Sequence, residues 1–104
     1  MKEVTPVELK KMLDSKEDFK LIDVREEHES EIASIGGTLI PMGTVIDRMN
    51  EIPKDKKVVV YCRSGKRAGV VISTLEQQGY TNLYNLKGGI LAYADEVDPS
   101  LMKY

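Results

Sequence analysis

The residues best able to do chemistry lie in one short basic segment that begins at the chain's single cysteine, Cys62. Three positive charges close to the sulfur favour its thiolate form over the thiol. A helix beginning here would add unpaired N–H groups and the positive end of its dipole, which also favour an anion. Small residues permit a tight curl whose N–H groups point inward. The segment consists of Cys62, Arg63, Ser64, Gly65, Lys66 and Arg67.

A lone cysteine is most often a small buried side chain that fills space. Cations are a costly neighbour for a sulfur that only fills space, because burial of charge is expensive. We therefore interpret Cys62 as a reactive nucleophile. The one histidine, His28, could form a Cys–His pair, but it lies in a run of glutamates typical of a solvated helix. We expect no catalytic role for His28.

The elements around Cys62 are predicted from the pattern of apolar residues. Residues 58–61 form a continuous β-prone run, which is typical of a strand covered on both faces. Residues 66–78 are predicted to be helical, with Val70, Val71 and Leu75 on one side and Gly79 as the C-terminal stop. Cys62 is thus the first residue after a buried strand, where ligands bind in open parallel sheets.

The rest of the chain alternates in the same way. Further strands are predicted at residues 3–4, 19–24, 38–40 and 83–86, and short helices at 26–32, 43–49 and 90–96. A first helix follows residue 4, since Thr5 can cap it, Pro6 suits its first position and Glu8 completes a capping box. Its apolar side would come from Val7 and Met12 with either Leu9 or Leu13. Strands alternating with helices at this spacing favour a parallel α/β sheet.

Composition limits the possible classes of protein. The chain has 104 residues, 41% hydrophobic and 31% charged, as expected for one globular domain over residues 1–104. A net charge of −2 gives no basic surface for nucleic acid, and no apolar run is long enough for a membrane span or signal region. The single cysteine excludes an internal disulfide and disfavours a structural zinc site. We expect a cytoplasmic protein without metal or cofactor.

Three segments together resemble the rhodanese family. Residues 21–26, with Glu29, are similar to the family's "DVRE" segment. Residues 59–65, with Arg67 and Ala68, resemble its catalytic loop, and residues 85–90 its closing "GG" segment. They occur in the family's order and spacing and span nearly the whole chain. The resemblance implies a rhodanese-like α/β fold, with a central, mostly parallel five-stranded sheet flanked by helices on both faces.

The resemblance also implies an activity, that of a thiosulfate:cyanide-type sulfurtransferase. Cys62 would carry sulfur as a persulfide, taken from a small anionic donor (thiosulfate or another persulfide) and passed to a thiol, cyanide or sulfur-carrier protein. The loop residues would bind the persulfide, while Asp23 and Arg25 would support the site. The simplest interpretation of Asp23 and Arg25 is a structural ion pair. For Arg67, substrate contact and bracing of the loop both remain open.

Loop length separates this chemistry from that of phosphatases in the same superfamily. Those relatives resemble Cys-x5-Arg, a wider cradle that holds a phosphate, whereas four residues separate Cys62 from Arg67 here. A non-catalytic interaction module is the main alternative, and a phosphatase or arsenate reductase is a weaker one. Residues 31–42 and 97–104 resemble rhodanese domains fused behind adenylyltransferases. Thiosulfate-specialised relatives often have a basic residue near the position of residue 36, and this chain has none there. Transfer of sulfur to a protein partner in a sulfur relay is therefore a serious variant of the predicted function.

Overall fold

The computed structural model describes residues 1–104, and a five-stranded sheet lies at its centre. The strands are β1 (Glu3–Val4), β2 (Lys20–Asp23), β3 (Thr38–Leu39), β4 (Val58–Tyr61) and β5 (Leu83–Leu86). They lie in the order β1-β5-β4-β2-β3, and every neighbouring pair is parallel. The predicted five-stranded α/β fold is confirmed, and the sheet is entirely rather than mostly parallel.

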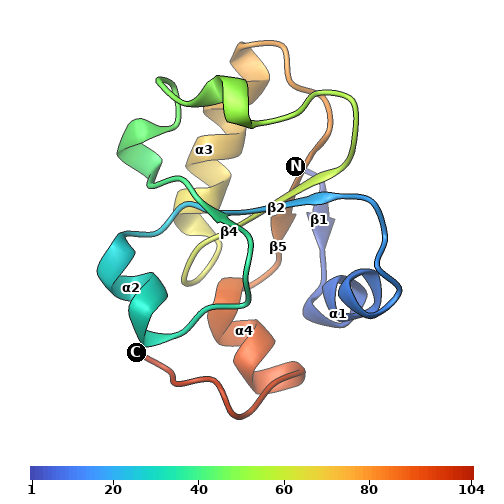
Figure 1. Cartoon of the computed structure of the whole chain (residues 1–104), viewed down its shortest axis with the longest axis vertical. Helices are drawn as coiled ribbons and strands as arrows, with labels where there is room; N and C mark the ends of the chain where they lie inside the picture. The colour runs from blue at the N-terminus through green and yellow to red at the C-terminus, as the bar shows by residue number, and fades with distance from the viewer.

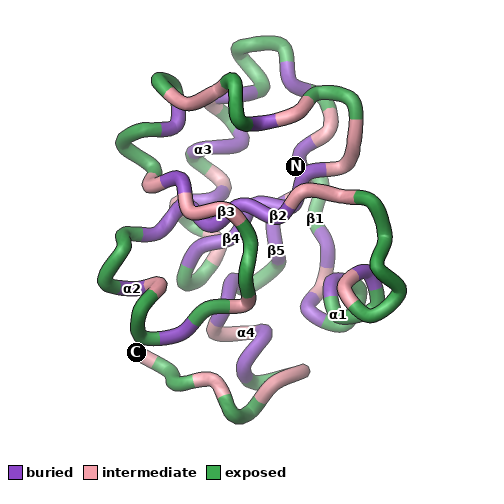
Figure 2. Tube along the Cα trace, viewed as in Figure 1, coloured by how far each residue is buried: buried purple, intermediate pink, exposed green.

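Helices cover both faces of this sheet (Figure 1). Helix α3 (Lys66–Gln77) packs on one face, and α1 (Pro6–Asp14) and α4 (Gly89–Glu96) on the other. The side chains of β4 alternate between the two cores, with Val60 facing α3 and Val59 facing α1 and α4. Figure 2 shows the buried residues concentrated along the sheet between the two layers. Helix α2 (Glu27–Ile32) lies close to the C-terminus of the chain (Figure 1).

The start of α1 follows its predicted local chemistry. Thr5 accepts a hydrogen bond from the N–H of Glu8, and the Glu8 carboxylate accepts one from the N–H of Thr5, which completes the capping box. The buried face of α1 differs from the prediction at one position. Val7 is exposed, whereas Leu9 and Met12 are buried. Leu13 is partly buried and packs against the same core.

Two further predictions were wrong in detail. Residues 43–49 do not form a helix but two 3-10 turns, Met42–Thr44 and Met49–Glu51. Only Val45 between them is fully buried, so this segment offers no continuous apolar face to stabilise an α-helix. In α3, Val70 is exposed, while its neighbour Val71 and Leu75 are buried.

The topology brings several strand ends to one edge of the sheet. Because all strands are parallel, their carboxyl ends meet at the same edge. Strand β2 ends there at Asp23, β4 at Tyr61 and β5 at Leu86. The residues that follow these ends form the candidate site described below. None of the helices combines the length and the apolar content that a membrane span requires.

Candidate active site

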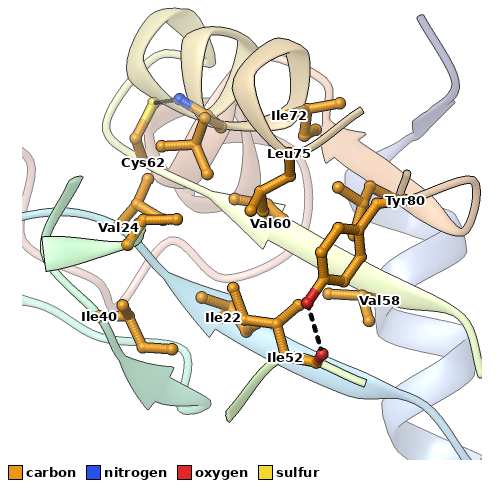
Figure 3. Close-up of a cluster of buried hydrophobic side chains, with 14 residues drawn as sticks. Ile22, Val24, Ile40, Ile52, Val58, Val60, Cys62, Ile72, Leu75 and Tyr80 are labelled. Carbon is orange, nitrogen blue, oxygen red and sulfur yellow. Dashed lines mark hydrogen bonds between the residues drawn. The ribbon is translucent and has the colours of Figure 1, made fainter. Parts of the chain in front are cut away.

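Cys62 immediately follows β4 and is almost completely buried, with 1% of the residue exposed. Its side chain belongs to the core between the sheet and α3, together with Val24 and Ala68. Figure 3 shows Cys62 at the edge of this cluster, with its sulfur facing the first turn of α3. The sulfur therefore lies where an apolar core meets the positive end of a helix dipole.

The loop after Cys62 curls around this sulfur. The Sγ atom accepts hydrogen bonds from the backbone N–H groups of Gly65, at 3.1 Å, and Ala68, at 3.4 Å. Gly65 has a φ of +101°, a conformation that side chains disfavour, so the curl depends on glycine at this position. The N–H groups of four other loop residues make no hydrogen bond within the chain; they belong to Arg63, Ser64, Lys66 and Arg67. Such a ring of N–H groups is an anion-binding nest.

Strand β5 and the first turn of α4 hold the loop from behind. The N–H groups of Ile90 and Leu91 donate to the carbonyl oxygens of Cys62 and Arg63, at 3.0 and 3.1 Å. The Asn85 side chain donates to the carbonyl oxygen of Gly65 at 3.0 Å. A Cβ atom at position 89 would lie 2.3 Å from the Arg63 carbonyl oxygen, which explains the glycine there. The loop is thus fixed through its carbonyl groups, while the N–H groups of Gly65 and Ala68 donate to the sulfur.

The three basic residues of the loop have different surroundings. Arg67 forms a two-point ion pair with Glu29 of α2, with N–O distances of 2.7 and 2.8 Å. Arg63 donates to the main-chain oxygen of Tyr104, and Lys66 is exposed and makes no ion pair. The hydrogen bonds that Arg67 donates to Glu29, and the coulombic attraction of Glu29 and then of Cys62, raise the pKa of Arg67. The charge of Arg67 thus reaches the sulfur although its donors are directed at Glu29.

Glu29 is the counterion of this loop. Its hydrogen bonds with Arg67, followed by those with the Glu26 backbone and Tyr104, outweigh partial burial and lower its pKa to about 2. The carboxylate is therefore ionised throughout the neutral range. The "DVRE" resemblance pointed to this residue, but its partner Arg67 is 38 positions further along the chain and was not predictable.

Asp23 and Arg25 form a buried ion pair beside the loop. Arg25 donates to both carboxylate oxygens of Asp23, at 2.9 and 2.8 Å, and the side chains are 0% and 3% exposed. Arg25 also donates to the carbonyl oxygens of Glu29 and Ala33, at 3.3 and 2.8 Å. These contacts connect the end of β2 to the middle and to the C-terminal end of α2.

Two other residues complete the description of the site. Tyr104 contacts Arg25, Glu29 and Arg63, and nothing in the sequence indicated these contacts. His28 is exposed on α2 and makes no hydrogen bond or ion pair. The histidine is therefore not brought into contact with the sulfur.

Comparison with known families agrees with this geometry. The model of the family described as "Rhodanese-like domain" matches residues 5–96. A protein named "Sulfurtransferase" from Allochromatium vinosum is 43% identical over 93 residues, covering 88% of this chain and 87% of that protein. The crystal structure of a rhodanese-like domain protein from Staphylococcus aureus superposes with a TM-score of 0.83 at 33% identity, covering 93% of this chain and 95% of that one.

A larger relative places a similar domain in a different context. The probable adenylyltransferase/sulfurtransferase MoeZ of Mycobacterium tuberculosis is 34% identical over 104 residues. The match covers 97% of this chain but only 26% of that protein. This is the type of fused relative that the segments at 31–42 and 97–104 resemble.

Proposed function

The chain belongs to the rhodanese-like domain family, and on that premise we propose that it is a sulfurtransferase that carries sulfur as a persulfide on Cys62. The observation that carries the proposal is the loop geometry. The Sγ atom already accepts two N–H groups, and four more in the same curl have no partner within the chain. An additional, negatively charged sulfur atom is the cargo that such a small nest suits.

The reaction proceeds in two displacements. The Cys62 thiolate attacks the outer sulfur of thiosulfate, the S–S bond of the donor breaks, and its electron pair leaves with sulfite. With a persulfide donor the leaving group is the corresponding thiolate. An acceptor then attacks the outer sulfur of the Cys62 persulfide, and the electron pair of that S–S bond returns to Cys62. Because the chain has one cysteine, the persulfide goes to an external acceptor.

The neighbouring residues have supporting roles in this scheme. The N–H groups from Arg63 to Arg67 hold the anionic outer sulfur, and Ser64 and Gly65 keep the loop small. Arg67 braces the loop against Glu29 and adds positive charge. The Asp23–Arg25 pair holds α2 in position. These roles assign the binding loop to residues 63–67 and the support to Asp23 and Arg25.

The proposal leaves the choice among donors and acceptors to experiment. Thiosulfate and protein persulfides are candidate donors, and cyanide, small thiols and a sulfur-carrier protein are candidate acceptors. The relation to MoeZ, whose name joins adenylyltransferase and sulfurtransferase activities, favours a protein acceptor. We place the domain in a sulfur relay on that ground.

Intact-mass measurement tests the proposal. The protein is incubated with thiosulfate or an organic persulfide, freed of donor, and weighed. We expect an adduct of one sulfur atom in the wild type, its removal by cyanide or a thiol, and no adduct in Cys62→Ser. Absence of an adduct with every donor would favour an interaction module. Hydrolysis of phosphate esters without an adduct would favour a phosphatase.

A further inference from the structure

The segment after α4 returns to the candidate site. Val97, Leu101 and Tyr104 pack against the core shared with α1 and α4, and the C-terminus lies close to α2 (Figure 1). Tyr104 is partly buried there and contacts three charged residues of the site. None of the sulfur chemistry proposed above uses this tyrosine.

The Tyr104 hydroxyl joins the two ion pairs beside the loop. It donates to Glu29 at 2.8 Å and accepts from Arg25 at 2.9 Å. Burial, above all, raises the pKa of Tyr104, so the hydroxyl stays protonated and keeps donating. The ring is thereby anchored at one place relative to α2. The anchored ring also fixes the position of the main-chain oxygen of Tyr104.

Arg63 binds this main-chain oxygen. The Nε and Nη2 atoms of Arg63 donate to the main-chain oxygen of Tyr104, the first at 2.6 Å. The guanidinium also lies 5.2 Å from the centre of the Tyr104 ring, within cation–π range. Arg63 is the residue next to Cys62, and its side chain is exposed. An anion approaching the sulfur must therefore compete with Tyr104 for this cation.

We propose that Tyr104 is a positioning residue that withholds Arg63 from anionic sulfur donors. In this arrangement Arg63 contributes less to the binding of a small dianion such as thiosulfate than the sequence suggests. The binding of a donor that uses other contacts is not weakened. The inference rests on the proposed function, since it concerns which donor reaches Cys62. It adds a residue outside the loop that sets donor preference.

Alkylation of Cys62 measures this effect without sulfur transfer. Iodoacetate is an anion and iodoacetamide is neutral, so the ratio of their rates reports how strongly the site attracts an anion. At low salt we expect Tyr104→Ala to raise the ratio roughly three- to tenfold, because loss of the ring anchor lets the main-chain oxygen of residue 104 move away from Arg63 and leaves this cation free to pair with an anion. Tyr84→Ala, which truncates another half-buried tyrosine packed on the same core, should leave the ratio unchanged.

A double-mutant cycle identifies Arg63 as the group released. In the wild type, Arg63→Gln should change the ratio less than about twofold, because Arg63 is already occupied by Tyr104. In the Tyr104→Ala background the same substitution should abolish the increase. The KM for thiosulfate should fall in Tyr104→Ala with little change in kcat. Loss of the ring as a merely structural element would not produce this dependence on Arg63.

Two results would overturn the proposal. One is a severalfold fall of the iodoacetate-to-iodoacetamide ratio in the single variant Arg63→Gln, because it would show that Arg63 already attracts anions while Tyr104 is present. This variant should fold, since Arg63 is exposed. The other is an increase in Tyr104→Ala that persists without Arg63. A different result would reject the proposed function alone: Cys62 is alkylated with the expected ratios but takes up no sulfur from any donor.

Discussion

At the scale of single residues, the site depends on close approaches between backbone segments. Gly89 and Gly36 both have positive φ, at +64° and +91°, but their surroundings differ. A Cβ atom at Gly89 would meet the Arg63 carbonyl oxygen at 2.3 Å, whereas at Gly36 it would meet nothing within 4 Å. The loop after Cys62 therefore requires glycine at position 89 for space as well as for conformation.

Alanine at these two glycines should separate the two effects. Gly36→Ala should cost about 1–2 kcal/mol in the free energy of unfolding, from the strained φ alone. Gly89→Ala should cost more and should also slow alkylation and sulfur loading of Cys62, because it displaces the loop. Chemical denaturation and intact-mass kinetics measure both quantities. Equal costs at the two positions would show that the loop tolerates the displacement.

At the scale of elements, Glu29 of α2 and Arg67 of α3 connect two helices that are distant in sequence. The folded chain lowers the pKa of Glu29 from 4.5 to about 2. A carboxyl group with a lowered pKa stabilises the folded state above its ordinary pKa. This contribution is therefore complete above about pH 4.5 and is lost as the pH falls towards 2.

Replacement of Glu29 by glutamine should remove that dependence. At pH 7 we expect Glu29→Gln to lower the free energy of unfolding by about 1–3 kcal/mol, the range for hydrogen bonds to charged groups. Between pH 5 and pH 2 the gap to the wild type should narrow, as measured by urea denaturation across that range. Glu51→Gln, in the exposed pair with Arg48, is the control and should cost less than about 1 kcal/mol.

Helix α3 offers a second test at this scale, because the sequence misplaced one of its apolar residues. Leu75 is completely buried and Val70 is 58% exposed. We expect Leu75→Ala to cost about 2–5 kcal/mol, since it leaves a cavity under the helix. Val70→Ala should cost within about 0.5 kcal/mol. Thermal and urea unfolding would compare them, and similar costs would contradict the burial of this face.

At the scale of the whole molecule, Arg25 connects segments from three parts of the chain. It binds Asp23 at the end of β2, carbonyl groups in the middle and at the C-terminal end of α2, and the hydroxyl of Tyr104. The site is therefore supported by the buried guanidinium of Arg25, which has partners on β2, on α2 and in the C-terminal segment. A buried cation that loses its counterion is far more costly than an exposed one.

Removal of the counterion should affect the entire fold. Asp23→Asn should lower the free energy of unfolding by about 3–5 kcal/mol, because Arg25 stays buried without a carboxylate. Asp18→Asn breaks an exposed pair with Lys56 and should cost less than about 1 kcal/mol. Denaturant unfolding measures both, and a small effect of Asp23→Asn would mean that water enters to solvate Arg25.

Several features were determined by the sequence itself. The capping box at Thr5 and Glu8, the strand at 58–61 and the helix after Gly65 depend on neighbouring residues, so their patterns were sufficient. The position of Cys62 at the end of a buried strand followed from the same local patterns. The helix predicted at 43–49 failed because short segments without a continuous apolar face depend on their surroundings.

Only the tertiary structure decided how the charges around Cys62 are used. The sequence placed three cations beside the sulfur, and the fold turned Arg67 towards Glu29 and Arg63 towards Tyr104. Partners 38 and 41 positions away in the chain cannot be read from local spacing, because they meet only when α2, α3 and the final segment pack together. Local sequence thus determined where the sulfur lies, and long-range packing determined which charges remain available to its substrate.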